Sequence, residues 1–350
     1  MITATESAHA DLPDGLHGAY TVQRARAMFH GQLRSRVDRG ELVGFGRGVL
    51  LDGDRADELR TRCAGALLLA GPSSVVVGPT AAALYGCTVP GGFPVHLKVP
   101  YERRVRSRDG LIVHQGYLNE DDIQLYDGMR VACLEWAITD VLCSASRRGA
   151  LACADQVLRS LRPSERIALR TDIIRRLGAR NDQRGTKQAH QLLALATGKP
   201  EHPVESALLL TVVDGGFPIP TCQHEVVNHG WPPRRLSLAW PSAKVGLVYG
   251  HDPNHDPADE QSDEADLRQF GWRIVHASWP DLRDPTALVI RLRAAFKANA
   301  ATPAQAAVVP VAISPTAMSA AVSAAGSNAM SDAMSNAVPT ARPSGDRKWD

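Results

Sequence analysis

Two short apolar segments joined by a Trp-Pro turn constrain the fold of this chain most. Residues 235–240 and 244–249 are rich in apolar side chains and flank Trp240-Pro241, which predicts two adjacent core strands. Further strands are expected at residues 221–227 and 272–276, and helices at 204–213, 264–270 and 285–296. Strands that alternate with helices in this way indicate a mixed α/β core.

The first fifty residues predict a small unit of different character. Residues 22–29 form an expected helix capped by Thr21, and residues 32–40 a second helix, with Leu33 and Val37 on its apolar side and Gly40 at its end. Residues 42–51 alternate like a hairpin with glycines at its tip. Helix, turn, helix and hairpin in this order predict a winged helix-turn-helix.

This N-terminal unit is basic. Residues 22–50 contain six arginines against two acids, Asp38 and Glu41. A recognition helix places such side chains on bases and phosphates, while the wing reaches the DNA backbone. We expect DNA contacts from Arg34, Arg36 and Arg39 on the second helix and from Arg47 on the hairpin. The alternative is a helix face that is merely solvated.

The middle of the chain mixes helices and strands. Strands are expected at residues 95–99 and 111–115, and helices at 57–70, 80–86, 135–143, 148–160, 166–177 and 188–197. Residues 103–108 contain four more arginines between the two strands. This loop could contact phosphates, bind an acidic partner or be solvated.

Composition limits the classes of protein that remain. The chain has 350 residues, 44% of them hydrophobic and 22% charged, which is typical of a globular protein with two or three domains. Because the net charge is only +2, attraction to nucleic acid must come from local patches. The six cysteines show no Cys-x-x-Cys spacing and predict reduced thiols without structural zinc. The absence of a signal sequence and of a long apolar run predicts a cytoplasmic protein.

The last fifty residues differ from the rest in composition. From about Asn299 the chain is mainly Ala, Ser, Pro, Met and Asn with no periodic apolar face, so we expect disorder. The expected boundaries are residues 1–18 for a flexible N-terminus, 19–56 for the winged helix, 57–187 for an α+β middle domain, 188–298 for a C-terminal α/β domain and 299–350 for the tail.

The order of several weak motifs resembles a known family. The motifs are Leu33 to Leu51, Thr80 to Gly86, Asp127 to Val131 with Asp140, Pro203 to Ser206, Leu238 to Pro241 and Gly271 to Arg273. In this order they are similar to an AbiEi-type antitoxin region followed by a Vsr-like, restriction-endonuclease-like domain. AbiEi proteins are antitoxins of type IV toxin–antitoxin systems that bind DNA through an N-terminal winged helix and repress their own operon. The resemblance covers roughly residues 20–297.

The resemblance also implies where a nuclease centre would lie. An intact member carries a helix Glu, matched here by Glu205, a strand Asp, which is Ser237 here, and a Glu-x-Asp pair, which becomes Val248 and Gly250. Magnesium prefers oxygen ligands, and hydrolysis needs that metal to activate water. Three of the four acidic positions have lost their carboxylate, so the resemblance implies a degraded nuclease without a catalytic residue, a bound metal or a cofactor.

The sequence therefore predicts a cytoplasmic DNA-binding regulator or type IV antitoxin-like protein with an inactive nuclease-fold domain. Its expected partners are double-stranded DNA, a cognate toxin and a second copy of the chain in a homodimer, but no membrane. One alternative is an active Mg²⁺-dependent endonuclease that uses Glu205 with displaced acids of the following loop. A second alternative is a module that neutralises a toxin without binding DNA. The loop acids in question are Asp252, Asp256, Asp259 and Glu260.

Overall fold

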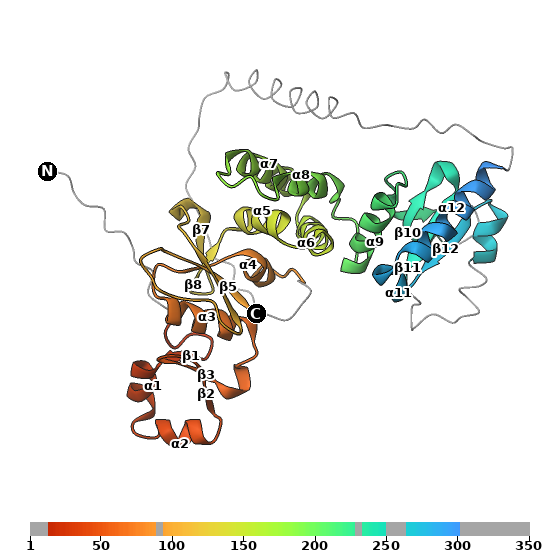
Figure 1. The fold of residues 1–350 in the computed structure, drawn as a ribbon. Coiled ribbons are helices and arrows are strands. Elements are labelled where there is room, and N and C mark those ends of the chain that lie inside the picture. The colour runs from red at the N-terminus through yellow and green to blue at the C-terminus, as the bar shows by residue number, and fades with distance from the viewer. Residues whose placement is uncertain (1–12, 89–93, 228–232, 250–263, 302–350) are drawn as a thin grey trace, which may run out of the picture. The chain divides into compact units, whose positions relative to one another are not determined.

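The computed structural model describes residues 13–88, 94–227, 233–249 and 264–301. The chain divides into two compact units, Met1–Pro303 and Ala304–Asp350, and the described residues all belong to the first. Three separate β-sheets with flanking helices make this unit a mixed α/β structure, as expected (Figure 1). The acidic loop and most of the predicted tail, residues 250–263 and 302–350, lie outside the described ranges. The tail was expected to begin at Asn299, but Asn299 and Ala300 still belong to the last helix, residues 286–300.

The N-terminal elements match the expected order. They are β1 (Ala19–Thr21), α1 (Val22–Phe29), α2 (Leu33–Asp38), β2 (Leu42–Gly46) and β3 (Val49–Asp52). The strands form an antiparallel sheet in the order β1-β3-β2. Thr21 caps α1 because its hydroxyl accepts a hydrogen bond from the backbone N–H of Arg24 at 3.1 Å. Gly40 has a φ of +75°, the left-handed conformation predicted for the residue that ends the second helix.

One expectation for this unit was wrong. Leu33 packs beside the small core around Tyr20, Ala25 and Leu42, but Val37 is 41% exposed. The helix α2 spans only six residues, so one turn of it can face this core and the next turn points to solvent.

The middle of the chain forms a five-stranded sheet. Its elements are η1 (Gly53–Arg55), α3 (Leu59–Ala70), β4 (Val75–Val76), α4 (Gly78–Leu84), β5 (Val95–Val99), β6 (Leu111–Gln115), η2 (Glu120–Asp122), β7 (Ile123–Tyr126) and β8 (Met129–Ala132). The strand order is β6-β5-β4-β8-β7, with β5 and β6 parallel. Residues 95–99 alternate buried and half-buried side chains, which places His96 and Lys98 together on one face of β5.

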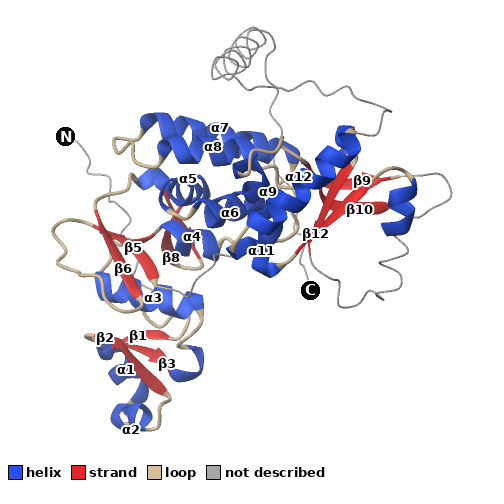
Figure 2. Ribbon diagram, turned by 45° about the vertical axis from the view of Figure 1, so that its right-hand side comes forward, coloured by secondary structure: helices blue, strands red, loops and turns tan. Residues whose placement is uncertain are grey.

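A helical layer links this sheet to the C-terminal part. It contains α5 (Leu134–Ser144), α6 (Arg147–Ser160), α7 (Pro163–Ala179) and α8 (Thr186–Leu195). These helices share one hydrophobic core with α9 (Pro203–Asp214) and with the C-terminal sheet (Figure 2). The core therefore continues across the boundary expected between residues 187 and 188, and Leu192 of α8 is fully buried in it.

The C-terminal sheet contains the two strands that the Trp-Pro turn predicted. Its elements are β9 (Thr221–Val226), β10 (Arg234–Trp240), η3 (Pro241–Ala243), β11 (Val245–Tyr249), β12 (Arg273–Ala277), α11 (Trp279–Arg283) and α12 (Thr286–Ala300), with residues 264–269 helical. The order is β12-β11-β10-β9, and only the β11–β12 pair of this sheet is parallel. Trp240 donates its indole N–H to the Pro218 carbonyl at 2.6 Å, which fixes the turn against the preceding loop.

Within the described ranges, no helix is long and apolar enough to cross a membrane.

Candidate nucleic-acid interface

Two of the four predicted DNA-binding arginines are free. Arg34 lies on α2, and Arg47 lies in the turn between β2 and β3. Both are exposed. Neither side chain has a hydrogen-bond or ion-pair partner among the described residues, so both guanidinium groups are available to an anionic ligand. Arg24 and Arg26 on α1 are also exposed.

The other two predicted arginines are engaged within the protein. Arg36 contacts Glu41 at 2.9 Å, and Arg39 contacts the same carboxylate at 2.6 Å. The Arg36 guanidinium also lies 4.5 Å from the centre of the Phe29 ring. The hydrogen bond from Arg39 lowers the pKa of Glu41. Both arginines reach Glu41 because Gly40 turns the chain and places Glu41 beside the end of α2.

The second arginine cluster lies against the hairpin. Arg108 donates to the backbone carbonyl of Phe45 at 2.9 Å, and its guanidinium carbon lies 5.6 Å from the centre of that ring. A side chain at Gly46 would collide with the Arg108 guanidinium, so glycine permits this close approach. Two basic segments that are sixty residues apart in the sequence are thereby brought together.

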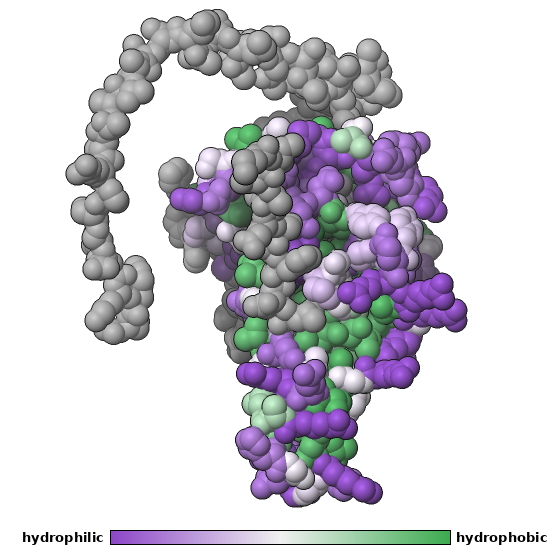
Figure 3. All heavy atoms as spheres, turned by 90° about the vertical axis from the view of Figure 1, so that its left-hand side faces the viewer, coloured by the Kyte–Doolittle hydropathy of each residue, from purple (hydrophilic) through white to green (hydrophobic). Residues whose placement is uncertain are grey.

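Within this second segment, Arg104 and Arg106 remain exposed and form no ion pair with any residue that the structure describes. Figure 3 shows hydrophilic side chains projecting from the N-terminal unit at the bottom of the view. The arrangement offers several unpaired guanidinium groups on adjacent elements, which is the kind of surface that binds phosphates.

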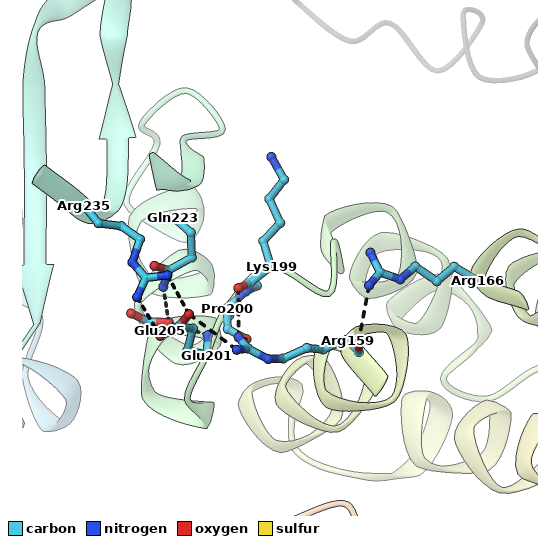
Figure 4. Close-up of polar contacts among 8 residues, drawn as sticks. All are labelled: Arg159, Arg166, Lys199, Pro200, Glu201, Glu205, Gln223 and Arg235. Carbon is cyan, nitrogen blue, oxygen red and sulfur yellow. Dashed lines mark hydrogen bonds and ion pairs between the residues drawn. The ribbon is translucent and has the colours of Figure 1, made fainter. Parts of the chain in front are cut away.

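The expected remnant of a nuclease centre is present at Glu205, but its carboxylate is already used. Glu205 lies in the first turn of α9 and is 8% exposed. One of its oxygens accepts hydrogen bonds from the Glu201 backbone N–H and from the Gln223 side-chain amide, both at 2.6 Å (Figure 4). The neighbouring acid Glu201 receives Arg235 at 2.8 Å and Arg159 at 3.4 Å. Both acids thus accept hydrogen bonds or ion pairs from protein donors, those of Glu205 all at one of its two oxygens.

The remaining expected positions contribute no carboxylate. Ser237 lies on β10, and Val248 on β11 packs beside Leu236 and Trp272. Gly250 and the four loop acids fall outside the described ranges. In the described part of the chain, no group of three His, Cys, Asp or Glu side chains is arranged to hold a metal ion.

Sequence reasoning missed Gln223, the residue that closes this site. Its φ is +51°, and it interrupts the pairing of β9 with β10 between Cys222 and His224. In this backbone conformation the Gln223 amide reaches Glu205. The sequence carries no signal for it, because glutamine is an ordinary strand residue and Gly or Asn is the usual mark of a positive φ.

A second cluster of ionisable groups was also missed, on the face of the middle sheet that meets α5. His96 Nδ1 lies 3.1 Å from His114 Nε2, and Asp140 lies 4.0 Å from Arg180. Burial lowers the pKa of His96 to about 4, lowers that of Lys98 and raises that of Asp140. The alternation in residues 95–99 is the one sequence feature that placed two of these groups on the same face.

These features define a mixed α/β protein with an arginine-rich helix–hairpin unit and a C-terminal sheet whose buried helix carboxylate is hydrogen-bonded within the protein. No known protein-family profile matches the chain. The chain is 31% identical over 266 residues to the uncharacterized protein Rv2248 of Mycobacterium tuberculosis strain H37Rv, and equally to the uncharacterized protein MT2308 of strain CDC 1551. The match covers 75% of this chain and 94% of each relative. The chain belongs to the family of these mycobacterial proteins.

Among solved structures, the chain is similar to the RV2827C protein of M. tuberculosis. The sequence identity is 14% and the TM-score 0.36, over 55% of this chain and 75% of that one.

Proposed function

We propose that this protein is a DNA-binding transcription regulator similar to AbiEi-type antitoxins, and that its N-terminal unit is a winged helix-turn-helix. The observation that carries the proposal is the pair Arg34 and Arg47, which are exposed on α2 and on the hairpin tip and form no ion pair within the described ranges. These are the two elements that contact the major groove and the backbone in winged-helix proteins. The sheet order β1-β3-β2 behind the two helices supports the same architecture.

The geometry favours backbone contacts over extensive base reading. The helix α2 has only six residues, so few of its side chains can reach base edges at once. Arginines on the hairpin tip and on the adjacent 103–108 loop would add phosphate contacts along the duplex. Binding through such contacts falls steeply with salt because bound counterions are released.

We further propose that the C-terminal sheet with α9 is a restriction-endonuclease-like domain that has lost hydrolytic activity. The proposal is supported by the hydrogen bonds that one oxygen of Glu205 already accepts, by the neutral side chain of Ser237 and by the apolar side chain of Val248. Such a domain would serve as a scaffold, as a dimer contact or as the surface that meets a cognate toxin. It needs no cofactor for any of these roles.

A gel-shift titration with the protein's own upstream DNA tests the DNA-binding proposal. We expect the double variant Arg34→Ala/Arg47→Ala to bind more weakly and to reduce the salt-dependence slope by about two, because two phosphate contacts are lost. The variant Arg36→Ala/Arg39→Ala removes the same charge from the same unit and is the matched control. Since Arg36 and Arg39 are paired with Glu41, its effect should be clearly smaller.

Two outcomes would contradict this proposal. Equal losses of DNA affinity in both double variants would show that only net charge matters and that Arg34 and Arg47 make no specific contact with DNA. Unchanged affinity and slope in Arg34→Ala/Arg47→Ala would exclude α2 and the hairpin tip from the interface.

A further inference from the structure

A cavity of about 330 Å³ opens at the carboxyl end of β5 in the middle sheet. Lys98 and Pro100 line it from β5 and the residue after it, Tyr117 and Leu118 from the segment that follows β6, and Arg130 from β8. Its volume lies at the lower end of the range of small-molecule sites. None of the residues in this wall belongs to the DNA-binding surface or to the Glu205 site.

Two cationic side chains in the wall, Lys98 and Arg130, have N–H groups that donate to no described protein acceptor. Lys98 is half-buried, with its ammonium nitrogen 5.0 Å from the centre of the Trp136 ring. It forms no hydrogen bond and no ion pair with any residue in the described ranges. Arg130 donates one terminal nitrogen to both oxygens of Glu120, at 2.9 and 3.2 Å, while its buried Nε has no partner. A half-buried ammonium without a protein acceptor is unfavourable, so a wall that contains Lys98 and the Arg130 guanidinium is suited to an oxyanion.

The acids in the same wall do not compete for these donors. Glu120 is occupied by Arg130, and Glu102 accepts a hydrogen bond from the Tyr117 hydroxyl. The hydrogen bond from Tyr117 lowers the pKa of Glu102, which keeps this carboxylate ionised and paired. Among the residues that line the cavity, the charge without an ion-pair partner is therefore positive, while Asp140, which does not line the cavity, raises the pKa of Lys98 against the larger effect of burial.

The rest of the wall is apolar or aromatic. Val75, Leu118 and Ile123 line the cavity and belong to one small apolar cluster with Trp136. Tyr117 stands at the rim in an edge-to-face pair with Tyr101, at 5.8 Å between ring centres. Such a surface accepts a hydrocarbon or aromatic group next to the charged one.

We propose that this cavity binds a small organic anion, whose carboxylate or phosphate group contacts Lys98 and Arg130 and whose apolar part lies against Leu118, Ile123 and Tyr117. The proposal does not depend on DNA binding. The anion would also raise the pKa of Lys98, which burial lowers.

Calorimetric titration of the full chain tests this site with three probes of similar size. Benzoate and phenyl phosphate carry the two kinds of anionic group, and benzyl alcohol is the neutral control. We expect at least one of the two anions to bind with a Kd of the order of 1 mM and benzyl alcohol to show no saturable binding. Lys98→Met keeps the apolar stem and should weaken the anion at least tenfold, whereas Lys187→Met, at an exposed lysine of α8, should leave it unchanged.

A second readout protects the test against a variant that folds poorly. Because Trp136 lies beside Lys98, the bound anion should change the tryptophan fluorescence of the chain, and Trp136→Phe should remove that change while the heat of binding remains. The proposal is overturned if neither anion binds below about 20 mM, if benzyl alcohol binds as tightly as the anions, or if Lys98→Met and Lys187→Met bind alike.

Discussion

At the scale of single residues, pairing decides which of the predicted charges are available. The count of arginines in the N-terminal unit was readable from the sequence, but the choice between free and engaged side chains was not. Glu41 follows a glycine that reverses the chain, and this geometry gives it both Arg36 and Arg39. Arg34 and Arg47, equal to them in the sequence, stay exposed and form no ion pair with any described residue, although Asp38 follows Arg34 by four residues on α2. A charge count predicts a basic surface and cannot predict its partners.

The His96–His114 pair makes stability depend on pH. The pKa of His96 is lowered from 6.5 to about 4, first by burial and then by His114, so the unfolded chain takes up this proton more readily than the folded chain. The contribution of the neutral His96 side chain to the free energy of unfolding is therefore fully present above pH 6.5 and is lost as the pH falls toward 4. The pKa of the neighbouring His114 is lowered by burial and by Lys98, whereas Asp140 raises it.

We expect His96→Asn to lose less stability than the natural chain when urea unfolding is compared at pH 7 and pH 5. The pKa of Asp140, which burial raises, changes stability in the opposite direction, so the comparison is made between the two proteins at each pH. An equal loss in both proteins would show that His96 takes up its proton at the same pH in the folded and unfolded chains.

At the scale of elements, local sequence patterns were sufficient where the elements are regular. The residues expected for the first helix and for strands β5 and β6 are those found in the structure, because caps and alternation mark them clearly. The strands β4, β7 and β8 were missed, since two to four residues are too few to establish an alternation. The small helix α11 was missed for the same reason.

For the candidate site too, the sequence predicted the elements but not the contacts between them. The positions of Glu205, Ser237 and Val248 on a helix and two strands followed from the sequence, and the structure has them on such elements. One of the two donors to Glu205 comes from Gln223, a strand residue with a positive φ, and the two histidines meet across neighbouring strands. Contacts of this kind depend on register and on tertiary packing, which local patterns do not specify.

The state of Glu205 predicts that the protein does not hydrolyse DNA. One hydrogen-bonded carboxylate on α9, without acids at Ser237 and Val248, cannot assemble the ligands that Mg²⁺ needs beside a phosphate. Plasmid, mismatched duplex and single-stranded DNA should all remain intact with Mg²⁺ or Mn²⁺. Metal-dependent cleavage that disappears in Glu205→Ala would instead establish the active endonuclease.

The same variant reports the structural role of this carboxylate. Glu205→Ala leaves the Glu201 N–H and the Gln223 amide without their acceptor, which should reduce the free energy of unfolding by about 1–3 kcal/mol. Glu205→Gln retains an acceptor oxygen and should lose less.

At the scale of the whole molecule, the largest core joins parts that the sequence separates. Apolar residues from α5 to α9, from the C-terminal sheet and from α12 pack into a single cluster. Composition placed the end of the apolar pattern near Asn299, whereas α12 continues to Ala300 and the first compact unit ends at Pro303. The interior of that unit has no comparable change in composition, so the boundary predicted at residues 187–188 had only a basic connector to support it.

Stability should therefore fall only when a truncation or substitution reaches α12, and not when residues beyond the first unit are removed. Asn299 in the last turn of α12 donates its amide to the carbonyls of Ala243 and Lys244, and its side-chain oxygen accepts from Arg273 at 2.7 Å. These bonds hold the Trp-Pro turn and β12 to the helix. Asn299→Ala removes them and should reduce the free energy of unfolding by about 1–2 kcal/mol.

Removal of residues 304–350 leaves every one of these bonds in place and takes away a segment with no periodic apolar face. We expect its melting temperature to stay within about one degree of that of the full chain, because little apolar surface is uncovered. Differential scanning calorimetry of the full chain, the truncation and Asn299→Ala compares the two effects directly. A drop of several degrees in the truncated chain, equal to that of Asn299→Ala, would mean that the segment packs on the folded unit and contributes to its stability.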